Sequence, residues 1–380
     1  METPVQIFDE WTRLAKLKKR FDPIPFEIAM PFDAQRARFN RRKSELRTMF
    51  LPNRSIEIHF DYINDGRCNA GAGIHKGVGL IGMNKGAILL PIEMFYKMLS
   101  HPEIWPWGGN PKKERRGGRH SEGMPINYDE LIHQRKLLGR KAVPQPPVDP
   151  TRKIIAECCA EIVWSFLILH ETVHICHGHV GYLQRTRNIP AILHVSRSPS
   201  PLSIFDLDFQ SLELWADSKA VSVVLRGLLL KTHSSDLDSV FQTQMSKIFL
   251  WSFAIHSLFR LWGIAIDPSD LTGYTHPPTL LRLELALSAA SVEIENEFPD
   301  LKGCFWEAIH DGQREAEKGF VYCGAEPITV DDLIGSKDPR VNDHCNALLD
   351  HHEKVLIEEL KKYTFVSLDD PIKNSVTSAA

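Results

Sequence analysis

Two kinds of hydrophobic spacing divide the chain. Residues 55–63 (SIEIHFDYI) alternate apolar and polar side chains, which is typical of a strand with one buried face. The glycine-punctuated run at residues 73–90 predicts two further strands. From Asp149 onward the apolar residues recur at helical spacing almost to the end of the chain. We therefore expect a small sheet followed by a mainly helical body, which is an α+β fold class.

The helical pattern can be divided into individual helices. Asp149 is a suitable N-cap and Pro150 suits the first turn, so a long helix is predicted to begin there. Shorter helices are predicted near residues 7–21 and 92–99. The long predicted helices cover residues 151–178, 207–231, 238–266, 278–296, 302–318 and 340–363.

Composition suggests three segments along the chain. They are a helical, basic lead-in at residues 1–54, a central domain at 55–296 and a helical extension at 297–380. Within the central domain, residues 101–150 are rich in Pro, Gly and charge, which predicts a mobile, solvated loop insertion. The tail at residues 374–380 is predicted to be disordered.

Charge and composition exclude several classes of protein. The formal net charge is −3, from 45 basic and 48 acidic residues, so no general attraction to nucleic acid or to an anionic membrane is expected. The longest uncharged apolar run, residues 248–259, is shorter than the roughly 20 residues that cross a bilayer, and we expect it to be a buried helix. The N-terminal residues lack the pattern of a secretory signal, which predicts a cytoplasmic protein.

The cysteines support the same compartment. Their number, seven, is odd, and no CxxC pair occurs, which indicates a reducing environment. The adjacent Cys158 and Cys159 lie in an apolar helical run, where small buried thiols are common, so we expect them in the core and not on a metal.

The strongest chemical signal is the segment LILHETVHICHGH, residues 167–179, which contains HExxH as His170, Glu171 and His174. Two histidines four apart on a helix project from one face, with Cβ atoms about 5–6 Å apart, so both can reach one ion. Glu171 lies beside the ion and can take a proton from an activated water. The preceding residues 162–169 are almost all apolar, and a buried Glu is costly unless a charge such as Zn²⁺ compensates it.

A catalytic zinc takes three protein ligands and leaves one position open, so the motif needs a third ligand. Glu213, in the apolar helical segment SLELWADSKAVSVVL, is the predicted one. Asp217 lies four residues later on the same face. We expect it to bind the free ring nitrogen of one zinc-bound histidine and so fix its tautomer.

His177 and His179 are the competing third ligands. The metzincin pattern HExxHxxGxxH needs Gly at position 177 and His at position 180, whereas this chain has His177 and Val180. Gly178 is instead predicted to end the helix. The register therefore favours Glu213 over either histidine.

A further segment, GYTHPPTLLRLELAL at residues 273–287, places His276 before a Pro pair at the start of a predicted helix. An N–H donor fixed there can stabilise the oxyanion of a tetrahedral intermediate, whereas the alternative is that His276 only caps the helix. Arg282 either anchors a carboxylate in the site or lies on the surface, and the sequence leaves both open.

Taken in order, HETVH, ELWAD and THPPTLLR resemble the gluzincin metallopeptidases, which carry HExxH, ExxAD and HPxxxxR. The chain is similar to the phage-exclusion Lit-like peptidases and, more distantly, to the CAAX-prenyl-protease and heat-shock membrane peptidase group. The resemblance covers residues 55–296. It implies zinc ligands at His170, His174 and Glu213, a general base at Glu171, assistance to the transition state from His276, and supporting roles for Asp217 and Arg282.

These inferences predict a zincin-like fold whose small twisted sheet packs on the HExxH helix. An edge strand near residues 79–90 is expected to take up an extended peptide as an added strand. The predicted function is a zinc-dependent endopeptidase, selective for a protein or peptide substrate and independent of membranes. The alternatives are a non-catalytic zinc-binding interaction module and a nucleic-acid-binding regulator that uses the basic stretches at residues 36–47 and 112–119.

Overall fold

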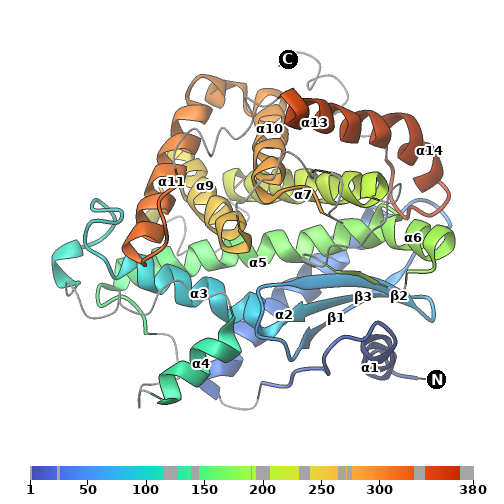
Figure 1. The fold of residues 1–380 in the computed structure, drawn as a ribbon, viewed down its shortest axis with the longest axis horizontal. Helices are drawn as coiled ribbons and strands as arrows, with labels where there is room; N and C mark the ends of the chain where they lie inside the picture. Colours follow the sequence, from blue (N-terminus) through green and yellow to red (C-terminus); the bar gives the residue numbers. More distant parts are fainter. Residues whose placement is uncertain are drawn as a thin grey trace.

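The computed structural model is mostly helical with one small sheet (Figure 1), which confirms the α+β class. It describes residues 2–23, 26–114, 127–137, 145–189, 191–193, 206–230, 240–263, 271, 276–328 and 339–368. Among these residues, every helix is too short or too polar to cross a lipid bilayer. The tail predicted to be disordered lies outside the described residues.

The sheet has four strands in the order β1-β3-β2-β4. They are β1 (Glu57–Ile63), β2 (Ala70–His75), β3 (Val78–Asn84) and β4 (Ala191–Leu193). β1 and β3 are parallel, whereas β2 is antiparallel to both of its neighbours. Lys76 and Gly77 connect β2 to β3 with φ angles of 49° and 76°, which is the backbone of a type I′ hairpin turn.

The predicted position of the edge strand is wrong. β3 lies between β1 and β2 in the interior of the sheet, and the chain turns into helix α3 (Lys85–Leu99) directly after Asn84. Residues 87–90 are all buried in that helix. A short, fully apolar run fits a buried helix as well as a buried strand, so periodicity could not separate the two. In the described sheet, the strands at the two ends of the order are β1 and β4.

Helix α5 (Pro150–Cys176) is the central element, and it runs between the sheet and the upper helices (Figure 1). The side chain of Asp149 accepts hydrogen bonds from the backbone N–H groups of Thr151 and Arg152, as the predicted N-cap should. At the other end Gly178 has a φ of 83°, just beyond the C-cap, which confirms that the helix ends there.

The other elements cover α5 from several sides. The other α-helices among the described residues are α1 (Pro4–Leu14), α2 (Phe26–Thr48), α4 (Tyr128–Leu137), α6 (His179–Arg187), α7 (Asp206–Leu229), α9 (Gln244–Trp262), α10 (Thr279–Glu297), α11 (Lys302–Tyr322), α13 (Pro339–His351) and α14 (Ile357–Leu360). A π-helical segment, His352–Leu356, joins the last two. The first helix is shorter than predicted, because it ends at Leu14.

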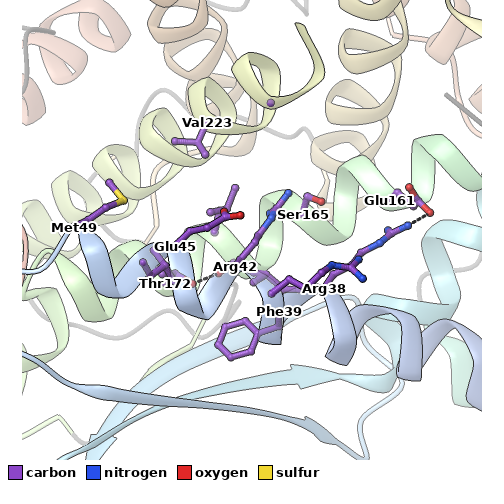
Figure 2. Close-up of a pocket in the computed structure, with 14 residues that line it drawn as sticks. Arg38, Phe39, Arg42, Glu45, Met49, Glu161, Ser165, Thr172 and Val223 are labelled. Atoms are coloured by element: carbon purple, nitrogen blue, oxygen red, sulfur yellow. Dashed lines mark hydrogen bonds and ion pairs between the residues drawn. The ribbon is translucent and has the colours of Figure 1, made fainter. Parts of the chain in front are cut away.

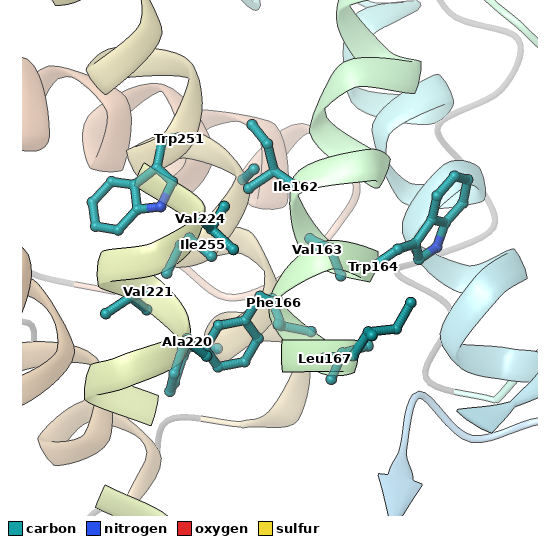
Figure 3. Packing of buried hydrophobic residues seen from close by; sticks show 14 of the residues in the cluster. Ile162, Val163, Trp164, Phe166, Leu167, Ala220, Val221, Val224, Trp251 and Ile255 are labelled. Carbon is teal, nitrogen blue, oxygen red and sulfur yellow. The ribbon is translucent and has the colours of Figure 1, made fainter. Parts of the chain in front are cut away.

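The core forms where α5, α7 and α9 meet (Figure 3). The apolar run predicted to be a buried helix lies in α9, and Cys158 and Cys159 are buried in α5, so both predictions are confirmed. All seven cysteines are unpaired. The side chains that interlock between the three helices include Ile162, Val163 and Phe166 of α5, Val221 and Val224 of α7, and Trp251 and Ile255 of α9.

The first part of the predicted loop insertion, residues 101–114, mixes exposed positions with buried ones that attach it to the core. Trp105 is fully buried and packs against Phe249 and Phe253 of α9. Arg152, itself fully buried, holds the surrounding backbone together. Its guanidinium donates hydrogen bonds to the carbonyl oxygens of Leu99, His101, Ile104, Trp105 and Gly108. Residues 115–126 and 138–144 of the insertion lie outside the described residues.

Replacing Arg152 with Met is expected to lower the free energy of unfolding by about 3–5 kcal/mol. The change removes the guanidinium donor from five backbone carbonyl groups, four of them in buried hydrogen bonds, and buried carbonyl groups cost free energy when they are unsatisfied. Denaturant unfolding followed by tryptophan fluorescence measures the loss. The neighbouring Lys153 is exposed, so Lys153→Met should change the same quantity by less than about 0.5 kcal/mol. Equal effects of the two substitutions would contradict the assignment.

Candidate metal centre

Three segments far apart in the sequence meet in one buried cluster. Helix α5 contributes the HExxH residues, α7 contributes two carboxylates, and the chain just before and within α10 contributes a histidine and an arginine. The cluster consists of His170, Glu171, His174, Glu213, Asp217, His276 and Arg282. All of the site residues proposed from the sequence therefore lie together.

The two histidines and Glu213 point their donor atoms at a common space. The Nε2 atoms of His170 and His174 are 2.9 Å apart. Glu213 lies 3.4 Å from the first ring through Oε2 and 3.2 Å from the second through Oε1. Donor atoms bound to one tetrahedral zinc at about 2.0–2.1 Å lie roughly 3.3–3.4 Å from one another. The carboxylate distances fit that spacing, and the two rings need to separate by only a few tenths of an ångström.

Asp217 and Arg282 support this group from behind. Asp217 Oδ1 lies 3.0 Å from Nδ1 of His170, the ring nitrogen that faces away from Glu213. Arg282 donates to both oxygens of Asp217, at 2.6 and 2.9 Å, and its Nη2 lies 3.4 Å from Glu213 Oε2. Because Arg282 is fully buried, the surface alternative for this residue is wrong. It instead contacts both carboxylates, and its contact with Asp217 is forked.

His179 contacts His174, and the sequence argument missed this contact. Its Nδ1 lies 3.0 Å from Nδ1 of His174, and its side chain is fully buried. His177 turns elsewhere and accepts a hydrogen bond from the indole N–H of Trp215. Neither histidine is among the three donors of the candidate metal group. Gly178 is the sequence feature that could have indicated this contact. The chain turns at this glycine, and the next residue, His179, lies beside His174.

We expect His179→Ala to lower the affinity for zinc by about 10–100-fold, because the orientation of the His174 ring would no longer be fixed. Competition with a chromophoric zinc chelator measures this affinity. His177→Ala removes a histidine two positions earlier that contacts Trp215, and its zinc affinity should stay within about twofold of the wild type. Equal losses in the two variants would refute the role of His179.

Glu171 provides a test of whether a cation fits. Its side chain is fully buried, and neither carboxylate oxygen has a hydrogen-bond partner among the described residues. Burial raises its pKa to about 8. A buried carboxyl group without a partner is costly, so such a group indicates a missing ion or water. The residues present therefore fit a divalent cation beside Glu171.

His276 lies at the open side of the cluster. Its Nε2 is 3.6 Å from Glu213 Oε2, and its side chain is 12% exposed, more than any other side chain of the cluster for which an exposure is given. Burial lowers its pKa to about 4, so the ring is neutral at pH 7 and keeps one N–H donor. The helix-capping alternative is wrong, because Pro278 is the N-cap of α10 and no described side chain caps it.

The charges of the cluster are balanced by its own residues. Burial opposes charge on His170, but hydrogen bonds to Asp217 and Glu213 outweigh it and raise the pKa of His170 to about 10. Burial also opposes ionisation of Asp217, yet the charge of Arg282 holds that pKa at about 2. Burial also opposes ionisation of Glu213, yet the nearby His276 and His174 hold its pKa well below the usual range. A bound cation would therefore take the place of the proton on His170.

Comparisons of this chain with protein-family models, with curated proteins and with solved structures found no match. The interpretation of the cluster therefore depends on its own geometry and on the order of the three motifs.

Proposed function

We propose that this protein is a zinc-dependent endopeptidase of the gluzincin type, related to the Lit-like peptidases. One observation carries the proposal: two imidazoles of α5 and one carboxylate of α7 converge within 4.8 Å, beside a buried glutamate that has no hydrogen-bond partner among the described residues. Two His and one Glu form a set of protein ligands found in catalytic zinc sites that keep one position open. The order of HETVH, ELWAD and THPPTLLR along the chain supports the same class.

Each residue would have a separate task in peptide hydrolysis. A zinc ion held by His170, His174 and Glu213 would supply Lewis-acid polarisation of the water and of the substrate carbonyl. Glu171 would accept the proton of the attacking water and pass it to the leaving amine. The neutral His276 would donate its N–H to the oxygen on which negative charge develops.

The surroundings of the cluster favour a selective enzyme. The three proposed ligands and Glu171 are fully buried, and the exposed part of His276 is small. A centre that is buried to this degree favours a particular protein segment as substrate over broad digestion. The seven unpaired cysteines are consistent with a reducing compartment such as the cytoplasm.

A comparison of cellular protein termini tests the proposal directly. Cells that express the wild type should contain new protein N-termini that are absent from cells expressing Glu171→Gln at the same level. The same preparations should contain one equivalent of zinc per chain in both variants. A wild type that binds zinc but yields no new termini under any growth condition would contradict the enzyme assignment.

The buried position of the centre also favours a second candidate, a zinc module without catalysis. In such a module the metal would join α5 to α7 and Glu171 would have no task. Loss of new termini in Glu171→Gln excludes this candidate, because the substitution leaves all three proposed ligands in place.

A further inference from the structure

A cavity lies on the side of α5 that faces away from the candidate metal centre, between this helix, α2 and α7 (Figure 2). Its volume is about 560 Å³, which falls within the range of small-molecule sites. Three kinds of side chain line it: arginines from α2, apolar residues from all three helices, and a few small or acidic residues. The cavity is lined by Arg38, Phe39, Arg41, Arg42, Glu45, Leu46, Met49, Glu161, Ser165, Ile168, Leu169, Thr172, Val223 and Gly227.

The cavity is separate from the metal centre. Its residues on α5 recur at helical spacing and share one face, which includes Ser165, Ile168 and Thr172. At about 100° per residue, this face points roughly opposite to the face that carries His170 and His174. The body of α5 therefore lies between the two sites, and a ligand in the cavity would touch none of the proposed metal ligands.

Positive charge is concentrated on one wall of the cavity. Arg38, Arg41 and Arg42 follow one another at spacings of three and one along α2. Arg38 is neutralised by an ion pair with Glu161. The guanidinium groups of Arg41 and Arg42 make no hydrogen bond or ion pair with another residue in the part of the chain that the structure describes.

Of Arg41 and Arg42, it is Arg42 that gives the stronger evidence for an anion site. Burial lowers its pKa below the usual range, and the charges of Arg38 and Arg41 lower it further, although Glu45 opposes them. Arg41 and Arg42 are adjacent like charges at a partly desolvated wall, and an anion between them would stabilise both. Arginine is also the side chain that best matches the planar oxygens of a carboxylate or a phosphate.

The rest of the cavity is apolar and open to solvent. Met49 is 63% exposed and Val223 is 51% exposed, so two large apolar side chains face the solvent at its margin. Ile168 and Leu169 of α5 continue this apolar surface inward. Apolar surface that faces water next to unpaired cations suits a ligand with both an apolar and an anionic part.

We propose that this cavity binds an anionic amphiphile, a small molecule with one apolar chain that ends in a carboxylate or a phosphate. The head group would lie between Arg41 and Arg42, and the chain would cover the surface formed by Met49, Leu169 and Val223. A nucleic acid does not fit, because it offers no apolar chain to this surface. The proposal is independent of the function proposed for the metal centre.

Isothermal titration of the full chain in buffer with EDTA tests the proposal, since the chelator removes any contribution from a metal. The probes are decanoate and decyl phosphate, which distinguish the two head groups, with decyltrimethylammonium and inorganic phosphate as comparisons. At least one of the two anionic probes should bind in the micromolar range at one site. Decyltrimethylammonium and inorganic phosphate should bind at least tenfold more weakly.

Two variants with matched controls locate the binding. The double substitution Arg41→Gln and Arg42→Gln should weaken binding of the anionic probe at least tenfold, whereas Arg47→Gln, on the same helix but outside the cavity lining, should change it by less than twofold. Val223→Trp should block the cavity, whereas Val321→Trp, at an exposed position of α11, should not. The proposal is overturned if no anionic probe binds, if the cationic probe binds equally well, or if the cavity variants behave like their controls.

Discussion

Peptide hydrolysis by the Glu171→Gln variant is expected to fall by about 10³-fold, with zinc still bound at one equivalent per chain. General acid–base catalysis contributes roughly 10²–10⁴-fold, and Gln can neither accept the proton of the water nor return it to the amine. Rates are measured on a peptide that spans the cleavage site identified from the new protein termini. Zinc content is measured on the same sample.

Because of the electrostatics of Glu171, the Glu171→Gln substitution should change proton transfer without changing the stability of the metal-free protein. Because burial raises the pKa of Glu171 to about 8, the side chain is mostly uncharged at pH 7 in the absence of metal. Gln is also uncharged and has nearly the same shape, so the metal-free variant should unfold at the same denaturant concentration as the wild type. Glu157→Gln, at a surface position of the same helix that contacts Tyr96 and Lys153, should keep full activity. Retained activity in Glu171→Gln would remove this residue from the reaction.

Glu213→Gln is expected to lower zinc affinity by about 10²–10³-fold. An amide oxygen is a much poorer zinc ligand than a carboxylate, and structural zinc sites with four ligands bind with roughly 10–16 kcal/mol in total. The loss of one ligand therefore costs about 3–4 kcal/mol. The measurement is the same chelator competition at fixed pH.

Another carboxylate of α7, outside the cluster, provides the control for Glu213. Asp208 is also buried, but it binds Tyr182, Arg187 and His351 and lies outside the candidate metal group. Asp208→Asn should lower stability and leave zinc affinity within about twofold of the wild type. If Glu213→Gln keeps the wild-type zinc affinity, Glu213 is not a zinc ligand and the centre has been assigned wrongly.

The helices were largely predictable from the sequence, because long amphipathic or apolar stretches with recognisable ends leave little ambiguity. Asp149 as N-cap and Gly178 as the terminating residue were both found from residue type alone. The short elements were less predictable. Residues 86–92 include no polar side chain to reveal the period, so the predicted edge strand turned out to be an interior strand followed by a helix.

The centre was predictable where spacing within a helix determines geometry. His170 and His174, or Glu213 and Asp217, share a helix face by virtue of their spacing, and each pair was expected to act together. The contact of Arg282 with Asp217 and the role of His179 depend on how helices pack and how the chain turns at Gly178. Neither distance along the sequence nor residue type contains that information.

The insertion at residues 101–150 shows how tertiary contacts override composition. Its Pro, Gly and charged residues are typical of a solvated loop, yet one arginine from the start of α5 organises residues 99–108 through backbone carbonyl groups. Only the position of that arginine in three dimensions reveals this role.

The segment after α14 returns to the end of α5, where the backbone N–H of Phe365 and the hydroxyl of Thr364 both donate to the carbonyl oxygen of Cys176. Gly178 packs directly against this returning segment, which leaves no room there for a side chain. During synthesis the N-terminal part of the chain leaves the ribosome first. His276, Arg282 and Thr364 therefore emerge after the HExxH helix, so a nascent chain contains the paired histidines before the residues that support them from α10 and from the segment after α14.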